Sequence, residues 1–276
     1  MNSMPKPILE MIVFIFGLMV GSFLNVCIWR LPREEQVVQG RSRCRSCGKL
    51  IRWFDNIPLA SFAILKGKCR NCKSPISAVY PAVELAAGLL FLGVVRSFGF
   101  SVLAVIHMIF GASLLLLSVI DAQQMILPDE VTLPGLQLGV VVSFFYPALH
   151  GQMNRWAGLW QAVFGALVGA GLIMVMNQVG RWIFRTKLAR LGEEEAVGFG
   201  DVKLMAMVGA FIGWKKTLLV ILLLGPLFGS LVGLVLKYRF GRDLIPYGPF
   251  LAIGTMVAVF WGEALINWYR CVLWIR

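Results

Sequence analysis

The sequence has few charged residues for its length. Only 14% of its 276 residues are charged, whereas 58% are hydrophobic. Soluble globular chains carry about 25% charged residues, so this composition excludes an ordinary soluble domain. It predicts an all-α polytopic membrane protein, because a hydrocarbon core of roughly 30 Å needs about 20 apolar residues in each helix that crosses it.

Several catalytic signatures are also missing. The only two histidines, His107 and His150, lie far apart in the chain, and neither an H-E-x-x-H nor a G-x-S-x-G motif occurs. Gly198-Phe199-Gly200 lacks the preceding strand and the spacing of a G-x-G-x-x-G nucleotide loop. These absences argue against a histidine-based metalloprotease, a nucleophile-elbow hydrolase and a dinucleotide-binding domain.

Long apolar runs occupy most of the chain. Eight are candidate transmembrane helices: residues 8–28, 78–95, 102–120, 131–149, 159–179, 204–214, 217–236 and 250–268. The sixth run is short and adjoins the seventh, so seven or eight spans fit. The first run is too long for a cleaved signal peptide, and it continues without a break into the next residues of the chain.

The net charge of +12 is concentrated in alternate loops. Eleven Lys or Arg residues lie between Arg30 and Lys73, against only three acids. Further basic groups follow the fifth span (Arg181, Arg185, Lys187, Arg190) and the seventh (Lys237, Arg239, Arg242). The positive-inside rule places these loops in the cytoplasm, and anionic lipid rather than nucleic acid explains the basic balance. Lys215 and Lys216 are exceptions to the rule, because this topology places them on the side of the membrane opposite the cytoplasm.

Residues 30–77 form the one substantial soluble segment, between a first transmembrane helix (1–29) and a membrane domain (78–276). The segment contains two C-x-x-C pairs separated by 21 residues: Cys44, Cys47, Cys69 and Cys72. This pattern is typical of a zinc-ribbon-like loop with structural zinc, or a substitute such as iron, because four thiolates leave no open coordination position. Disulfide or redox pairs are the alternative, which a reducing cytoplasm disfavours.

Two aspartates stand at the edges of apolar runs. Asp201 follows Gly198 and Gly200, whose backbone freedom permits close approach of an extended peptide. Asp121 ends the third span, where a helix C-terminus disfavours negative charge. In the eight-span topology both aspartates lie at the cytoplasmic membrane edge. Capping of the following helix is an alternative role for Asp201.

Other polar positions carry weaker signals. Glu84, near the inner end of the second span, is either a polar contact in the helix bundle or an accessory to the site. Asp129 precedes the fourth span and is predicted to be its N-cap. Residues 245–250 form a structured entry into the last span. Cys27 and Cys271 are expected to be inert.

Two adjacent carboxylates suit peptide hydrolysis. Since both cannot easily ionise, one retains a proton while the other acts as a base. The base activates water, and the acid protonates the carbonyl or the departing amine. A non-enzymatic membrane scaffold that recruits a partner through the cysteine loop is an alternative. A transporter with a proton relay is another, but it predicts acids near mid-membrane and two similar halves.

The ordered set of motifs resembles the bacterial type IV prepilin peptidases, bifunctional leader peptidases and N-methyltransferases. The matching stretches are residues 21–32, the two C-x-x-C pairs, Asp121 with Leu127-Pro128-Asp129, residues 198–203 and residues 245–250. The G-x-G-D element alone is shared with presenilin-type and archaeal preflagellin peptidases, and the cysteine loop makes the resemblance more specific.

The resemblance implies an aspartic endopeptidase of the bacterial inner membrane with Asp121 and Asp201 as its catalytic pair. Its substrates would be prepilins or pseudopilins, with a short basic leader that ends in glycine before a hydrophobic helix. We expect Gly198, Gly200, Lys203 and Glu84 to support the site or the approach of substrate. Methylation of the new amino terminus from S-adenosylmethionine is also implied, although no residue in the sequence marks that cofactor's site.

Overall fold

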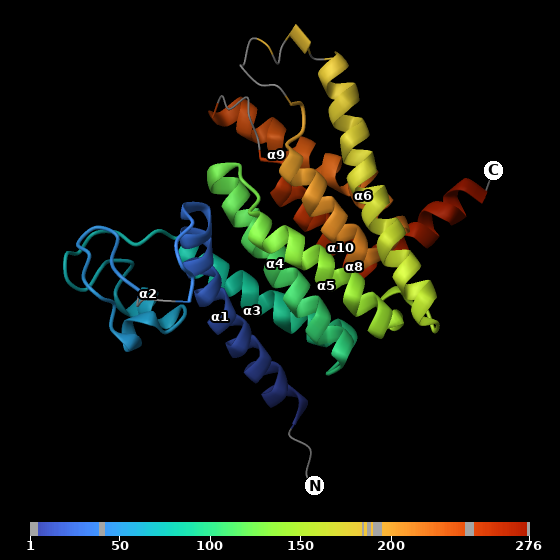
Figure 1. Cartoon of the computed structure of the whole chain (residues 1–276). Coiled ribbons are helices and arrows are strands. Elements are labelled where there is room, and N and C mark those ends of the chain that lie inside the picture. The colour runs from blue at the N-terminus through green and yellow to red at the C-terminus, as the bar shows by residue number, and fades with distance from the viewer. Residues whose placement is uncertain are drawn as a thin grey trace. The chain divides into compact units, whose positions relative to one another are not determined.

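The computed structural model describes residues 5–38, 42–183, 185–186, 189, 195–240 and 246–274, and most of these are helical. Within these ranges the only extended pairings are two isolated bridges, Arg43 with Leu50 and Lys68 with Pro75. The chain divides into two compact units, Met1–Leu116 and Leu117–Arg276. The boundary falls inside helix α4 (Val102–Gln124; Figure 1). The predicted all-α fold is confirmed.

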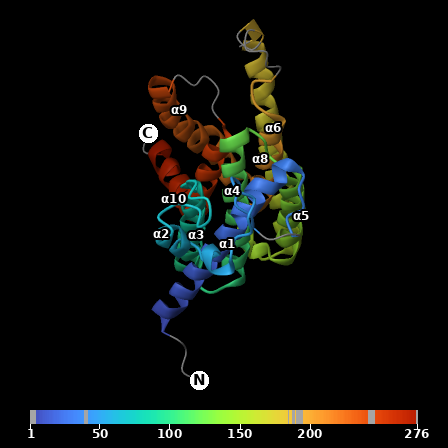
Figure 2. The same ribbon diagram turned by 90° about the vertical axis from the view of Figure 1, so that its left-hand side faces the viewer.

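The first unit is built on two helices that pack along each other, α1 (Lys6–Arg30) and α3 (Val79–Phe98) (Figures 1 and 2). A Cβ atom on Gly21 would lie 2.6 Å from Cα of Glu84, so only glycine permits this approach. The loop between the two helices carries the short helix α2 (Ala60–Ile64) and the 3₁₀ turns Leu31–Arg33 and Trp53–Asn56.

The second unit begins with the end of α4 and continues through α5 (Asp129–Phe145), the 3₁₀ turn Pro147–His150 and α6 (Arg155–Ile183). It then forms α8 (Phe199–Leu219), a π-helical turn (Val220–Leu224), α9 (Gly225–Phe240) and α10 (Gly248–Trp274). Helices α6 and α8 pack along each other in both ribbon views (Figures 1 and 2). Helix α8 supplies much of the core, with Met205, Met207 and Val208 fully buried.

Helix α8 is interrupted at Gly213, whose φ of 74° and ψ of 165° are not helical. Glycine adopts this positive φ without the penalty that a side chain would cause. Gly169 of α6 faces both Met205 and Thr217, which a continuous helix would hold about 18 Å apart. The chain therefore folds back at Gly213, and the sixth and seventh expected spans are separate helical segments.

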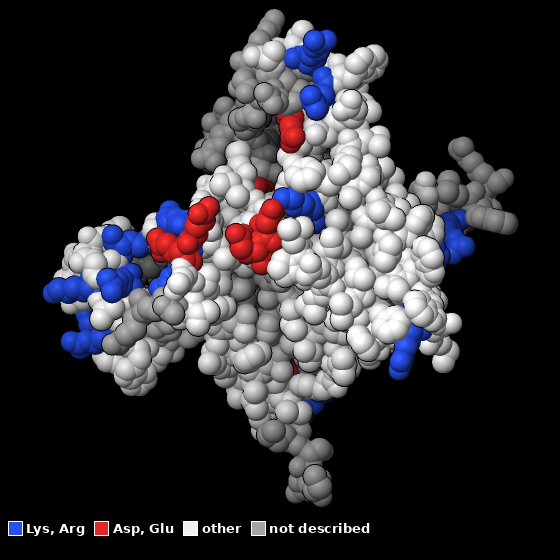
Figure 3. All heavy atoms as spheres, in the orientation of Figure 1, with Lys and Arg blue, Asp and Glu red and all other residues white. Residues whose placement is uncertain are grey.

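Six helical segments in the described part of the chain are long and apolar enough to cross a membrane: Lys6–Arg33, Val79–Phe98, Val102–Gln124, Arg155–Ile183, Phe199–Val235 and Gly248–Val272. The fifth contains the break at Gly213, and the 17-residue α5 is a further apolar helix. The expected number of about eight spans is thus approximate. A largely uncharged helical surface is visible in Figure 3.

Two expectations about helix ends are wrong. The fourth expected span, residues 131–149, ends early, because α5 stops at Phe145 and Pro147 opens a 3₁₀ turn. Asp129 is not an N-cap, since Pro128 occupies that position and Asp129 is the first helical residue. Several positions of the basic loops (Arg41, Lys187, Arg190, Arg242), together with Ile245, lie outside the described residues.

Candidate active site and metal centre

Asp121 lies in the last turn of α4 and is only 6% exposed. Its Oδ2 accepts the backbone N–H of Gly248, 127 positions further along the chain, at 2.9 Å. Gly248 is the first residue of α10, so the carboxylate faces the partially positive N-terminus of that helix. This contact offsets the unfavourable effect that the C-terminus of α4 has on the negative charge of Asp121.

Asp201 is the third residue of α8 and is 8% exposed. The N-cap position belongs to Gly198, and no side chain caps the helix from there. Instead, the N–H of Phe199, the first helical residue, donates to Oε2 of Glu195 at 3.1 Å. Capping therefore does not account for Asp201.

The second unit brings Asp121 and Asp201 together. The two buried carboxylates are close enough for the charge of Asp121 to act on Asp201. Tyr247 completes the group, because burial and, to a smaller extent, the charge of Asp201 raise the pKa of its phenol to about 12. Tyr247 is therefore a neutral hydroxyl beside an acid pair. Its only signal in the sequence is its position in the short Pro246–Pro249 interruption before an apolar run.

Gly198 and Gly200 do not use unusual backbone angles. Gly198 has a φ of −65° and a ψ of 145°, and Gly200 lies in the first turn of α8. A Cβ atom on Gly200 would come within 3.0 Å of Cβ of Leu127, so its small size matters through close packing. The two glycines thus do not show the backbone freedom that the sequence suggested. Gly200 instead allows Leu127 to pack closely against the start of α8.

Lys203, two residues after Asp201, binds Asp129. Its Nζ lies 2.6 and 2.7 Å from the two carboxylate oxygens of Asp129, and 5.0 Å from the ring centroid of Phe199. This ion pair joins the fifth residue of α8 to the first residue of α5. Lys203 therefore contacts two of the segments that the sequence motifs mark.

Glu84 belongs to the first unit, whereas both aspartates belong to the second. It lies on α3, is 8% exposed, and accepts the backbone N–H of Leu59 at 2.8 Å and a hydrogen bond from the Ser22 side chain. Leu59 has a φ of 58°, an uncommon conformation for a branched side chain. Glu84 thus fixes a strained point of the cysteine loop to α3, a contact that the sequence did not reveal.

The four cysteines of the loop converge on one point. Their sulfur atoms all lie within 4.8 Å of one another, and those of Cys44 and Cys72 are 3.8 Å apart. In a tetrahedral site with zinc–sulfur distances of about 2.3 Å, the sulfurs are about 3.8 Å apart. The donor set therefore fits a single tetrahedral metal ion.

The two C-x-x-C turns have the same local geometry. The N–H of Cys44 donates to the Lys49 carbonyl and that of Cys69 to the Ser74 carbonyl, each at 2.9 Å. The residue after the second cysteine is left-handed in both turns, Gly48 in one and Lys73 in the other. The backbone N–H of Cys47 lowers the pKa of the Cys44 thiol to about 6, which favours the metal-binding thiolate.

Comparisons with known proteins cover both units. Residues 15–98 match the model of the bacterial peptidase A24 N-terminal domain, and residues 108–234 match that of the type IV leader peptidase family. No solved structure shows significant similarity to the chain.

Relatives named prepilin leader peptidase/N-methyltransferase align over most of the chain. The protein from Pseudomonas putida is 38% identical over 277 residues, which cover 91% of this chain and 90% of the relative. Those from Aeromonas hydrophila and Pseudomonas aeruginosa are each 35% identical, over 94% and 92% of this chain and 92% and 91% of the relatives. The chain therefore belongs to the type IV leader peptidase family.

Proposed function

We propose that this protein is an aspartic endopeptidase that removes the short basic leader of type IV prepilins or pseudopilins at the cytoplasmic face of the bacterial inner membrane. It would then methylate the amino terminus that cleavage exposes, as the names of its relatives indicate. The observation that carries the proposal is the buried pair of Asp121 and Asp201. No other buried acid pair is found in the described ranges of the chain.

The surroundings of the two aspartates suggest different roles. Asp121 accepts the Gly248 N–H at the N-terminus of α10, and both the hydrogen bond and the helix dipole stabilise its anion. Asp201 lies beside this charge, and like charges in one site disfavour a second ionisation. Asp121 is therefore the base, and Asp201 holds the proton.

These roles give a direct hydrolysis. Asp121 removes a proton from water as the water oxygen attacks the carbonyl carbon of the scissile peptide. Asp201 donates its proton to the carbonyl oxygen, which gives a diol. When the diol collapses and the carbon–nitrogen bond breaks, the departing amine takes the proton that Asp121 removed from water, and a hydroxyl of the diol returns a proton to Asp201. The phenol of Tyr247, which lies close enough to Asp201 for that charge to act on it, would serve as a hydrogen-bond donor in the same site.

The two other expected groups have separate tasks. Cys44, Cys47, Cys69 and Cys72 would hold zinc, which would cross-link the loop and take no part in hydrolysis because its four ligands are complete. S-adenosylmethionine supplies the methyl group that the new amino terminus receives.

Replacement of each aspartate tests the peptidase proposal. We expect Asp121→Asn and Asp201→Asn each to slow leader cleavage by roughly 10³-fold, the usual contribution of general acid–base catalysis. Cleavage of a prepilin is measured in membranes without any methyl donor, with expression and melting temperature compared. Glu263→Gln, a change at a surface acid of α10, is the control. Full cleavage in either aspartate variant would contradict the proposal.

A further inference from the structure

We propose that a cavity in the first unit binds S-adenosylmethionine, with Glu84 as the counter-ion of the donor's cationic end. The inference rests on the methyl transfer included in the proposed function, and it names the binding site for that activity. The size of the cavity, the charges on its walls and the bonding of Glu84 support it.

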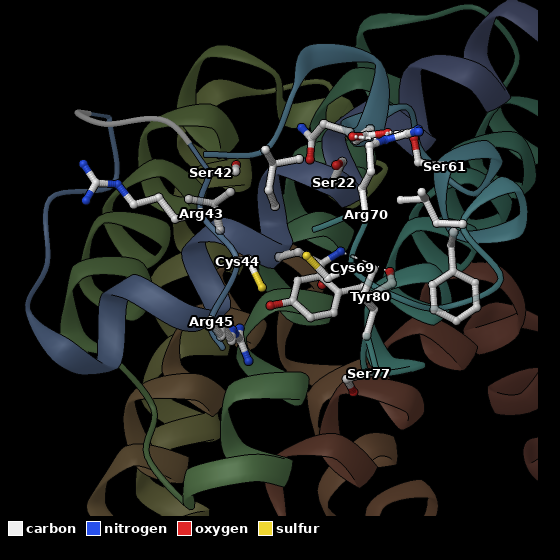
Figure 4. Close-up of a pocket in the computed structure, with 18 of the residues that line it drawn as sticks. Ser22, Ser42, Arg43, Cys44, Arg45, Ser61, Cys69, Arg70, Ser77 and Tyr80 are labelled. Carbon is white, nitrogen blue, oxygen red and sulfur yellow. Dashed lines mark hydrogen bonds and ion pairs between the residues drawn. The ribbon is translucent and has the colours of Figure 1, made fainter. Parts of the chain in front are cut away.

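The cavity lies between the cysteine loop and the adjoining ends of α1 and α3, and its volume is about 980 Å³. Small-molecule sites in proteins occupy roughly 300–1,000 Å³, so a nucleoside of this kind fits. Figure 4 shows Ser22 of α1, Tyr80 of α3 and Cys44 of the loop around this space. Apolar side chains, among them Ile51, Phe62 and Ile76, provide surface for the adenine ring.

The walls carry both signs of charge. Three acids line the cavity, Glu35, Asp55 and Glu84, together with six cations: Arg30, Arg43, Arg45, Lys49, Arg52 and Arg70. A phospholipid phosphate would account only for the cations, and a basic leader peptide only for the acids. S-adenosylmethionine carries a sulfonium, an ammonium and a carboxylate, so it matches both groups of residues.

Glu84 differs from Asp55, another acid of the cavity, in two ways: it is buried, and it has no cationic partner among the described residues. Asp55 is neutralised by Arg70, whose nitrogens lie 2.6 to 3.0 Å from its carboxylate oxygens. Glu84 accepts hydrogen bonds only from neutral donors, Leu59 N–H and the Ser22 side chain, and forms no salt bridge with any described residue. A buried carboxylate without a cationic partner is costly, and a cationic ligand would remove that cost.

Direct binding tests the inference without a prepilin. The full-length protein is placed in phospholipid nanodiscs, and equilibrium dialysis measures the binding of labelled S-adenosylmethionine. We expect about one site per chain and at least about tenfold weaker binding in Glu84→Gln, which keeps an acceptor for the Leu59 N–H but loses the charge. Glu10→Gln is the matched control, because Glu10 pairs with Arg96 and does not line the cavity. It should change the affinity less than threefold.

A second measurement does not depend on any variant. Ultraviolet crosslinking of labelled S-adenosylmethionine to the wild-type protein should label fragments from residues 22–84. Label confined to residues 117–276, wild-type affinity in Glu84→Gln, or no binding by the wild-type protein would overturn the inference. So would displacement of the donor by phosphatidylglycerol or by a basic leader peptide. Loss of leader cleavage by the aspartate variants is measured without methyl donor, so the two proposals fail separately.

Discussion

Asp121 and Gly248 form a hydrogen bond of 2.9 Å between the end of one helix and the start of another, and a side chain at position 248 would have to displace the Asp121 carboxylate. A Cβ atom on Gly248 would lie 2.7 Å from Oδ2 of Asp121. This pair of residues therefore sets the position of one carboxylate of the proposed dyad through the backbone of α10.

Gly248→Ala should consequently displace the Asp121 carboxylate. A shift of about 1 Å in a catalytic group costs on the order of 10²-fold in rate, so we expect leader cleavage to fall by about that factor. Melting temperature and cleavage rate are measured together. Gly229→Ala in α9 is the control, because a Cβ atom there would have only ordinary contacts of 3.6 to 3.9 Å. Normal cleavage in Gly248→Ala would show that Asp121 does not need this position.

Removal of one cysteine ligand should release the metal. We expect Cys44→Ser to lower the bound zinc from about one ion per chain to near zero, because a structural site needs all four thiolates. Metal content and the rate of tryptic cleavage within residues 30–77 are the measurements. Cys271→Ser, which changes a cysteine outside the cluster, should leave both unchanged. Full metal content in Cys44→Ser would argue against a four-thiolate site.

The two C-x-x-C turns provide a matched pair of backbone substitutions. Lys73 has a φ of 59°, and the equivalent Gly48 has a φ of 71°. A non-glycine residue in this conformation costs about 1 kcal/mol, so Lys73→Gly should make the loop more stable and Gly48→Ala less stable by similar amounts. Resistance of the metal-loaded loop to proteolysis reports the change. Equal behaviour of the two variants would show that neither turn is strained.

The ion pair of Lys203 and Asp129 should contribute little to stability. The Lys203 side chain is 23% exposed and that of Asp129 is 50% exposed, and solvent screens pairs of this kind. A double-mutant cycle with Lys203→Met and Asp129→Asn should therefore give a coupling energy of about 0.2–1 kcal/mol in thermal unfolding. A coupling of several kcal/mol would indicate a buried pair that holds the site together.

Mild acid should destabilise the second unit through His150. Burial, followed by the charge of Lys216, lowers the pKa of His150 to about 4, and its ring bonds Oγ of Ser143 at 2.8 Å. The unfolded histidine, with a pKa of about 6.5, binds a proton more readily than the folded one. The contribution of His150 to the free energy of unfolding is therefore complete above about pH 6.5, and it is lost progressively as the pH falls toward 4.

The melting temperature should follow this change in protonation. Between pH 8 and pH 5 we expect a fall of about 2–4 °C that His150→Gln reduces. The same slope in His150→Gln would assign the pH dependence to other groups.

The features that the sequence predicted well are those that depend on short, local stretches of residues. The apolar runs predict helices by length alone, and Cys44, Cys47, Cys69 and Cys72 converge because their spacing is that of a metal site. Counting the membrane spans between Asp121 and Asp201 predicts that the two residues share one membrane face, but it does not predict the distance between them. These predictions need no knowledge of how the helices pack.

The errors arose where packing decides the outcome. Asp129 looked like a helix cap, but Lys203 in another helix takes its carboxylate, and Pro128 fills the cap position. Asp121 looked misplaced at a helix C-terminus because its partner, Gly248, is 127 positions away. Tyr247 and the bond from Leu59 to Glu84 are likewise tertiary contacts that no local pattern encodes.

The break at Gly213 limits how much lipid the first part of α8 can cross. Residues 199–212 rise only about 21 Å, at about 1.5 Å for each residue, whereas the hydrocarbon layer is about 30 Å thick. A helix this short produces a hydrophobic mismatch, which a membrane relieves by becoming thinner around it. Because Asp201 lies in the first turn of this helix, such thinning would bring the aqueous phase, and with it the water that the proposed hydrolysis consumes, to its carboxylate.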